Sequence, residues 1–486
     1  MGAGLSGICA GHHLQTSAPW ASYAILEGRA ALGGNWDLFR YPGVRSDSDM
    51  FTLGFPFRPW TSNQMIVDGA SIRGYIEDTA AEEGIDQHIR YQHRVLSAAW
   101  CSREGRWRVR ASGPDGEDVE LTCRFLFSCT GYYNYEQGYR PRFDGEEHFG
   151  GAIVHPQHWP EDLAYDNQRV VVIGSGATAV TLVPAMAERA AHVTMLQRSP
   201  TYVASVPARN PMVGALRRVL PDKVAANSVR WVHALGAQGM YVFSRRHPNA
   251  VRRALQYMVR RQLPDGYAVD PHFTPSYDPW DERMCAVPGG DLFKAISSGR
   301  AEVVTDHIDT FTETGIRLRS GRELDADVVV AATGLDLLFL GGIELTVDGV
   351  PADVAGRLTY KGMMLEGLPN LAFAIGYTNA SWTLKCDLTA AYVARLLNHM
   401  RDRQQWRCTP VNHDPALEAR PFLEMRSGYV ARAADRMPAQ GSRFPWQVHQ
   451  SFLRDYRAMR MGGLDDGAME FAAVGADAPL LSTQVA

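Results

Sequence analysis

The clearest pattern along the chain is the segment Arg169–Ile173, in which a valine run ends at an isoleucine and a glycine-rich turn follows at once. Continuous apolar runs of this kind are typical of strands that are buried on both faces of a parallel sheet. We expect a helix after the turn, up to about Ala187, and then a second strand over His192–Gln197. This order of strand, turn, helix and strand predicts an α/β fold.

A weaker copy of the same pattern lies at the N-terminus. Gly2, Gly4 and Gly7 form a glycine-rich turn, and a strand is expected over Ser22–Leu26. The fold requires a strand before the turn, yet Met1 directly precedes Gly2. Either the true start lies upstream, or the chain is a fragment with a damaged first domain. We expect a misplaced start, which predicts coding sequence for a β-branched apolar strand upstream of Met1.

A third segment, from about 211 to 268, differs in character from the rest. Met212–Leu263 has helical periodicity and many arginines, with apolar residues such as Trp231 and Leu235 between them. We expect a helical insertion. Basic amphipathic helices of this kind can lie on membranes. We favour a solvated helical cap over a substrate channel, and peripheral membrane contact remains the alternative.

Composition narrows the class of protein. The chain has 486 residues, enough for two or three domains, and its formal net charge of −4 gives no reason to expect a nucleic-acid partner. Its seven cysteines include no CxxC pair, so we expect no metal site, disulfide framework or disulfide reductase. No secretory leader is visible, which favours the cytoplasm. The uncharged run Val170–Ala187 has the length of a membrane span, but it contains the second glycine turn.

The first turn has the spacing of a dinucleotide-binding loop. In the pattern GxGxxG, Gly2 permits a tight turn, Gly4 lets the backbone approach a pyrophosphate, and Gly7 allows close helix packing. Ser6 lies in the first turn of the following helix, where it can donate a hydrogen bond. Glu27 ends the next strand, where a carboxylate binds a ribose hydroxyl. Together these features predict FAD.

The second turn, Gly174-Ser175-Gly176-Ala177-Thr178-Ala179, reads GxGxxA, and its second strand ends at Arg198 rather than at an acid. An arginine there suits the 2′-phosphate of NADP, which a carboxylate would repel. This unit therefore predicts NADPH, with expected contacts from Gly174, Ser175, Gly176, Ala177, Thr178, Ala179, Val180, Arg198 and Ser199. Two dinucleotides in one chain indicate that NADPH supplies hydride and that the flavin does the remaining chemistry.

A stretch between the two turns identifies a family. Phe149-Gly150-Gly151-Ala152-Ile153-Val154-His155-Pro156-Gln157-His158-Trp159-Pro160 fits the pattern FxGxxxHxxxWP at every fixed position. The chain thus resembles the class B flavin monooxygenases, and among them the Baeyer–Villiger monooxygenases. The two turns Cys129-Thr130-Gly131 and Ala332-Thr333-Gly334 are similar to further motifs of that family. In the family, the fingerprint segment joins the domains and its histidine couples their movement.

The resemblance also implies which residues meet the cofactors. The segment from Gly33 to Met50 is similar to the family's GG(T)W…YPG.R.D motif, with Asn35 in place of the usual threonine. It implies one set of residues beside the flavin ring, namely Gly34, Asn35, Trp36, Asp37 and Leu38. A second set, Arg45, Ser46 and Asp47, is implied as a wall of the nicotinamide channel. Val95 matches a position whose backbone contacts the adenine.

Arg283 and Asp47 are the candidate catalytic residues. Oxygen transfer to a ketone requires an anionic oxygen species, which a fixed cation in a dry pocket stabilises. The position of Arg283 resembles that of the active-site arginine in Baeyer–Villiger enzymes, and Asp47 matches the aspartate that orients it. Without the resemblance, Arg283 would be read as a surface arginine paired with Asp281 or Glu282.

The sequence therefore predicts two Rossmann-like dinucleotide-binding domains, one for FAD and one for NADPH, with a helical insertion. We expect the FAD domain over 1–162 and 337–486, and the NADPH domain over 163–336. The predicted activity is insertion of one oxygen atom of O2 into small-molecule ketones, with S-oxidation of sulfides or thioamides. A flavin-containing monooxygenase acting only on N and S centres, and a truncated non-catalytic NADPH-binding relic, remain as alternatives. The substrate and the oligomeric state cannot be read from these patterns.

Overall fold

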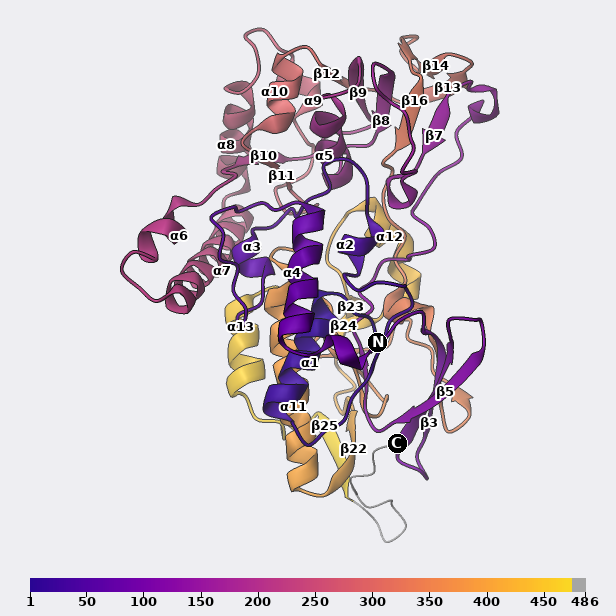
Figure 1. Cartoon of the computed structure of the whole chain (residues 1–486), viewed down its shortest axis with the longest axis vertical. Helices are drawn as coiled ribbons and strands as arrows, with labels where there is room; N and C mark the ends of the chain where they lie inside the picture. Colours follow the sequence, from indigo (N-terminus) through magenta and orange to yellow (C-terminus); the bar gives the residue numbers. More distant parts are fainter. Residues whose placement is uncertain (474–486) are drawn as a thin grey trace.

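The computed structural model describes residues 1–473 and consists of two α/β units arranged along the long axis of the molecule (Figure 1). One unit, at the top of Figure 1, contains β8, β9, β12 and β16 with the helices α5 and α10. The other contains the long helices α1, α4 and α11. This architecture confirms the predicted α/β class with a helical insertion.

The upper unit is built on a five-stranded parallel sheet in the order β12-β9-β8-β16-β7. Its strands are β7 (Ala152–Val154), β8 (Arg169–Ile173), β9 (His192–Gln197), β12 (Ala301–Thr305) and β16 (Val328–Ala331). The valine run of β8 is fully buried, which explains why it is apolar on both faces. The helices α5 (Ala177–Met186) and α10 (Asp291–Ser297) pack beside it. The structure confirms both strands predicted for this unit, with the predicted bounds.

The lower unit has a mixed sheet in the order β19-β20-β21-β6, and a short parallel pair, β1 and β2. Residues 1–3 lie between this sheet and this pair: the Gly2 amide donates to Leu26 O at 2.8 Å, and the Cys129 amide donates to Met1 O at 2.7 Å. They thus occupy the central position of the glycine-turn unit. β1 covers only Ile25–Leu26, which is shorter than the strand predicted over 22–26.

The lower unit also contains helices and several short strands. Its helices are α1 (Leu5–Ser17), α2 (Asn35–Leu38), α3 (Met50–Leu53), α4 (Gly69–Glu82), α11 (Trp382–Asp402), α12 (Gly428–Ala433) and α13 (Phe452–Tyr456). Its shorter strands are β2 (Ile89–Arg90), β6 (Leu126–Ser128), β19 (Thr359–Tyr360), β20 (Met364–Leu365), β21 (Leu371–Phe373), β22 (Gln405–Pro410), β23 (Ala419–Pro421), β24 (Ala439–Gly441) and β25 (Met469–Ala473).

Smaller sheets flank both units. One has the order β18-β17-β3-β4-β5 and contains β3 (Arg94–Cys101), β4 (Arg106–Ser112), β5 (Asp118–Cys123), β17 (Glu344–Val347) and β18 (Val350–Pro351). Another contains β13 (Ile308–Thr312), β14 (Gly315–Leu318) and β15 (Glu323–Asp325), and a parallel pair contains β10 (Val203–Val206) and β11 (Cys285–Pro288). β7 pairs with β16 in the upper sheet, although β7 precedes residue 162, where we predicted the boundary between the domains. The exact domain boundary stays a prediction.

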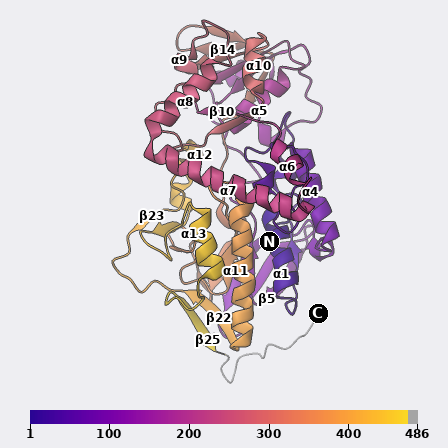
Figure 2. The ribbon, with the colours of Figure 1, turned by 90° about the vertical axis from the view of Figure 1, so that its left-hand side faces the viewer.

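The predicted helical insertion consists of α6 (Pro211–Leu216), α7 (Asp222–Arg246), α8 (Pro248–Arg260) and the short α9 (Val269–His272). The longest of these, α7, leaves the upper unit and crosses the face of the lower one (Figure 2). Within residues 1–473, no helix is both long enough and apolar enough to span a bilayer.

Arg230 fastens α7 to the lower unit. Its buried guanidinium donates to the backbone oxygens of Phe51 at 3.1 Å and Thr52 at 2.9 Å, and to that of Gly54 at 2.5 Å. These carbonyls belong to the C-terminal end of α3, where helical carbonyls lack partners within the helix. The positive charge also faces the negative end of the α3 dipole. Arg230 therefore binds three carbonyls at this helix end across the two units, while the Leu53 carbonyl accepts from the Thr383 hydroxyl.

We expect Arg230→Met to destabilise the protein by roughly 2–4 kcal/mol, because the methionine fills the space but leaves these buried carbonyls without donors. The melting temperature should fall by several degrees, measured by circular dichroism. Arg253→Met on α8, an exposed arginine, is the matched control and should melt like the wild type. Equal melting of the two variants would contradict this role for Arg230.

Candidate active site

A cavity of about 1310 Å³ lies between the two units and is lined by both. Its volume exceeds the range of about 300–1,000 Å³ that is usual for a site holding one small ligand. Most of the residues singled out from the sequence lie on its wall: Gly2, Gly4, Ser6, Glu27, Gly34, Asn35, Trp36, Leu38, Arg45, Ser46, Asp47, Val95, Gly174, Ser175, Gly176, Ala177, Arg198, Ser199 and Arg283. The fold therefore brings both glycine turns and Arg283 to one cavity.

The first glycine turn has no room for side chains. Gly2 has a φ of +91°, and a Cβ on it would lie 2.6 Å from Cys129 O. A Cβ on Gly7 would lie 1.9 Å from Gly2 O, so α1 can approach the turn only because residue 7 is glycine. Gly4, the N-cap of α1, offers no side chain to the first amides of the helix. Amides in this position bind phosphate groups.

Glu27 lies beside this turn and is buried. Its two carboxylate oxygens accept hydrogen bonds from the Ala3 amide at 2.7 Å and the Arg29 amide at 2.9 Å. Burial raises the pKa of Glu27, and these two amides oppose that shift. The hydroxyl of Ser6 accepts a bond from the Trp382 indole at 2.8 Å, which ties α1 to α11. The bonds leave one side of the Glu27 carboxylate open to the cavity, where a ribose hydroxyl can donate to it.

The second glycine turn repeats this geometry in the upper unit. Gly174 has a φ of +138°, and a Cβ on it would lie 2.3 Å from Ala332 O. Nothing lies within 4 Å of a Cβ on Gly176, which caps α5 and faces open space. The Ser175 hydroxyl donates to Ser199 O at 3.0 Å and holds the turn against the end of β9. Arg198 is exposed at this edge and free to meet a phosphate.

Five residues named from the sequence do not line the cavity: Gly7, Asp37, Thr178, Ala179 and Val180. Gly7, Ala179 and Val180 are buried in helix packing. Asp37 does not line the cavity, and three arginines surround its carboxylate: Arg29 contacts Oδ2 at 2.7 Å, and Arg40 and Arg73 contact Oδ1 at 2.5 Å and 3.3 Å. The motif could not reveal this, since Arg73 lies on α4.

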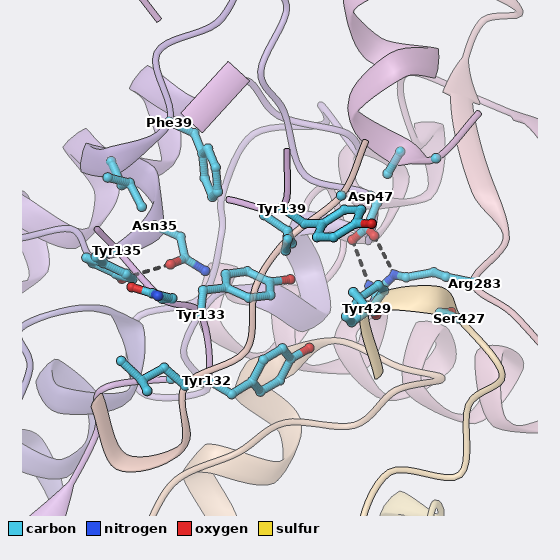
Figure 3. Close-up of a pocket in the computed structure, with 18 of the residues that line it drawn as sticks. Asn35, Phe39, Asp47, Tyr132, Tyr133, Tyr135, Tyr139, Arg283, Ser427 and Tyr429 are labelled. Atoms are coloured by element: carbon cyan, nitrogen blue, oxygen red, sulfur yellow. Dashed lines mark hydrogen bonds and ion pairs between the residues drawn. The ribbon is translucent and has the colours of Figure 1, made fainter. Parts of the chain in front are cut away.

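Arg283 and Asp47 meet across the cavity as a two-point ion pair (Figure 3). The guanidinium Nη2 lies 2.9 Å from Asp47 Oδ1, and Nε lies 2.6 Å from Oδ2. The Asp47 carboxylate raises the pKa of Arg283 above its usual range, and burial opposes this effect. Arg283 therefore does not pair with Asp281 or Glu282, the alternative partners suggested by the sequence. It stays charged and keeps further N–H groups for a ligand.

The loop that carries Arg283 is held from outside the upper sheet. Trp280 has a φ of +74°, which is uncommon for an aromatic residue. Its ring packs edge-on against Tyr241 of α7. The carboxylate of Asp281 accepts from Arg245 of α7 at 2.6 Å, and the Asp281 carbonyl accepts from the Arg426 amide at 3.0 Å. The helical insertion thus fixes the backbone next to Arg283.

Tyrosines dominate the rest of the wall, and the sequence reading missed them (Figure 3). Tyr132, Tyr133 and Tyr429 surround the Arg283–Asp47 pair, and burial raises the pKa of each phenol, so all three remain protonated. Tyr139 stacks under the Arg432 guanidinium at 3.5 Å. The double tyrosine directly after the turn Cys129-Thr130-Gly131 could have been noticed in the sequence. Tyr429 and Arg432 lie in a C-terminal segment that carries no motif.

Two further side chains with reactive groups, His158 and Cys285, line the cavity. His158 Nε2 bonds to Glu136 O at 2.9 Å, and burial raises the pKa of Cys285 to about 12, which is typical of an inert thiol. Although the sequence has no metal-ligand spacing, the fold brings Cys9, His13 and Asp387 together, with potential ligand atoms within 4.8 Å. His13 and Arg460 already bond to the Asp387 carboxylate.

The chain is similar to known proteins in sequence and in fold. Residues 46–212 match the flavin-binding monooxygenase-like family. The chain is 54% identical to the FAD-containing monooxygenase EthA of Mycobacterium tuberculosis over 97% of this chain and 96% of that protein. Its fold is similar to an open crystal structure of cyclohexanone monooxygenase (TM-score 0.77, 19% identity, 97% and 98% of the chains). It is also similar to a steroid monooxygenase bound to NADP (TM-score 0.74, 22% identity, the same coverage).

We expect Gly7→Ala to weaken FAD binding by roughly ten- to hundredfold, since overpacking of this contact costs about 1–3 kcal/mol. Flavin content after purification and titration of the stripped protein with FAD measure the effect. Gly239→Ala in α7 is the control, because a Cβ there meets nothing within 4 Å. Retention of wild-type FAD affinity by Gly7→Ala would show that the turn does not hold the phosphates.

Proposed function

Because this chain belongs to the flavin-binding monooxygenase family, we propose that it inserts one oxygen atom of O2 into ketones, giving esters or lactones. It uses FAD and NADPH, as an enzyme of this class. We also propose S-oxidation of sulfides or thioamides, because sulfur accepts the same oxygen atom. The observation that carries the proposal is the Arg283–Asp47 ion pair in a cavity that both glycine turns line.

The residues present fit the two cofactors. Gly2 and Gly7 have no room for a side chain, because a Cβ on either would collide with backbone. The α1 amides are therefore open for the FAD phosphates beside Glu27. Arg198 and the Gly174 turn suit the phosphates of NADPH. Once reduced by NADPH, the bound flavin supplies the activation of O2. The remaining steps depend on the residues of this chain.

We assign to Arg283 the stabilisation of negative charge on oxygen during transfer. Asp47 takes two of its N–H groups, which fixes the plane of the guanidinium and leaves the other N–H groups toward the cavity. Arginine is suited to this because it does not lose its proton at any pH the enzyme meets. The rings of Tyr132, Tyr133 and Tyr429 limit the access of water to this charge, which strengthens its field.

The experiment that tests the proposal is a product assay on purified holoenzyme with NADPH, O2, a simple ketone and, separately, a simple sulfide. Formation of an ester or lactone from the ketone supports it. Sulfoxide from the sulfide with no product from the ketone would favour a monooxygenase of N and S centres. Protein that binds NADPH but takes up no flavin would favour the non-catalytic alternative.

Arg283→Ala is expected to separate the two half-reactions. Anaerobic reduction of the flavin by NADPH should continue, whereas oxygen transfer should fall by roughly 100-fold or more, the scale for loss of a preorganised charge. Hydrogen peroxide should appear instead of ester. Stopped-flow absorbance and product analysis measure the two steps, and Arg283→Lys tests whether charge alone suffices. Normal oxygen transfer by Arg283→Ala would contradict the assignment.

We also propose that the enzyme touches anionic membranes through the outer face of α7. This face carries exposed apolar side chains: Val224 (50% exposed), Val232 (50%), Leu235 (43%), Met240 (54%) and Phe243 (48%). Exposed arginines lie at its C-terminal end, on α8 and directly after α8, namely Arg246, Arg253, Arg260 and Arg261. An apolar stripe beside cations matches the charge of an acidic lipid surface. Reversible contact would bring lipophilic substrates to a cytoplasmic enzyme.

We expect the protein to co-sediment with phosphatidylglycerol vesicles and not with phosphatidylcholine vesicles. The double variant Val232→Ser/Leu235→Ser should lose at least about tenfold in vesicle affinity, because two apolar anchors are removed. Val350→Ser, at an exposed valine of β18 outside this face, is the control. Unchanged vesicle binding by the double variant would refute the proposed membrane surface. The proposal would also be refuted if the wild type bound no vesicles and the double variant lost self-association instead.

A further inference from the structure

We propose that Tyr135 is a positioning residue that sets the orientation of the Asn35 amide, so that this side chain presents its N–H group to the flavin. Asn35 occupies the position where the resemblance leads one to expect threonine. The inference rests on the proposed function, since it assigns a role toward the cofactor. It adds a chain of contacts that runs from the fingerprint segment to the flavin pocket.

The contact between the two side chains is direct. The Tyr135 hydroxyl donates to Asn35 Oδ1 at 2.7 Å. Figure 3 shows this bond, with the Asn35 amide nitrogen on the opposite side from Tyr135. Both residues line the cavity. An amide whose oxygen is engaged in this way must turn its NH2 donor elsewhere, and here that direction is the cavity.

The structure gives the direction of this bond, because the amide oxygen of Asn35, and not its nitrogen, lies next to the Tyr135 hydroxyl. Burial raises the pKa of this phenol well above its ordinary value, so the hydroxyl keeps the proton that it donates. With its oxygen engaged by the tyrosine, the Asn35 amide has its nitrogen left for the cavity.

The backbone brings the two side chains together from separate segments. Gly34 has a φ of +59° and lies against Gly4. A Cβ on Gly34 would lie 3.4 Å from the Tyr135 hydroxyl. Asn35 begins α2, and its carbonyl accepts from the Phe39 amide at 3.0 Å. The side chain is thus projected from a fixed turn, at the point where the first phosphate loop and the tyrosine converge.

Tyr135 is in turn held by the fingerprint segment. The buried amide of Gln157 donates to the backbone oxygens of Asn134 at 2.8 Å and Tyr135 at 3.1 Å. Asn134 bonds to the carboxylate of Asp336 at 3.0 Å, and Arg436 binds the other oxygen of that carboxylate at 2.8 Å. Gln157 stands at a variable position of the fingerprint, so the motif itself does not predict this contact.

The chemistry of an amide explains why the position needs such support. A threonine hydroxyl rotates and can donate or accept in either direction, whereas an asparagine donates from one end only. A donor that faces the heteroatoms of the flavin ring favours its reduced state, because reduction adds negative charge to the ring. Without Tyr135, the amide oxygen can turn toward the ring and have the opposite effect.

The experiment compares Tyr135→Phe with the wild type, both loaded with FAD. The variant keeps the ring and loses only the hydroxyl. We expect a more negative reduction potential, a shifted visible absorbance band of the bound flavin, and a dissociation constant for FAD that rises roughly three- to tenfold, the loss of one hydrogen bond. Tyr165→Phe, a buried tyrosine outside the cavity wall, is the control and should change none of these.

A second background tests whether the effect passes through Asn35. In Asn35→Thr protein, the additional change Tyr135→Phe should shift the potential and the absorbance band much less than it does alone, as a double-mutant cycle measures. Gln157→Glu, which sets a carboxylate against two carbonyls, should reproduce the spectral shift of Tyr135→Phe.

Two outcomes would overturn the inference while leaving the proposed function intact. One is wild-type potential and spectrum in Tyr135→Phe. The other is an undiminished effect of Tyr135→Phe in the Asn35→Thr background, which would mean that the tyrosine acts by another route. Failure of the wild-type protein to bind FAD would instead overturn the proposed function itself, so the two failures are distinguishable.

Discussion

The ion pair between Arg283 and Asp47 is the interaction on which the site depends, because its two partners come from different units of the fold. Asp47 belongs to the lower unit and Arg283 to the loop before β11 in the upper one. A guanidinium withdrawn from bulk water is costly unless a carboxylate faces it. The two charges meet only because the two units are packed together, which couples this part of the cavity wall to the whole architecture.

A glycine turn from each unit lines the same cavity as this pair. In both turns a Cβ would overlap a backbone oxygen, at 1.9 Å for Gly7 and 2.3 Å for Gly174. The chain can thus bring helix amides close to a phosphate twice, once in each unit. Because α1 and α5 both open on the same cavity, two dinucleotides bound there would face each other across Arg283.

Other contacts across the units support the same arrangement. Arg45 pairs with Asp291 of α10, and Arg230 binds the end of α3. Within the upper unit and its helical insertion, Arg245 holds Asp281 beside Arg283. The helical insertion therefore has two sides with different contacts. The inner side of α7 holds the loop before Arg283, and its outer side exposes apolar side chains to solvent.

Local parts of this protein could be predicted from the amino-acid sequence alone. The buried strands β8 and β9, both glycine turns, Glu27 and Arg198 follow from periodicity and spacing, since each depends on neighbours in the chain. Arg283 and Asp47 came from family resemblance, and only the structure shows that they bind each other. Tyr429 on the cavity wall, the enclosure of Asp37 by arginines, and the Tyr135–Asn35 bond were decided by tertiary packing. These contacts join residues that are distant in sequence or carry no motif, and no local pattern encodes which side chains will meet when separate segments fold against one another.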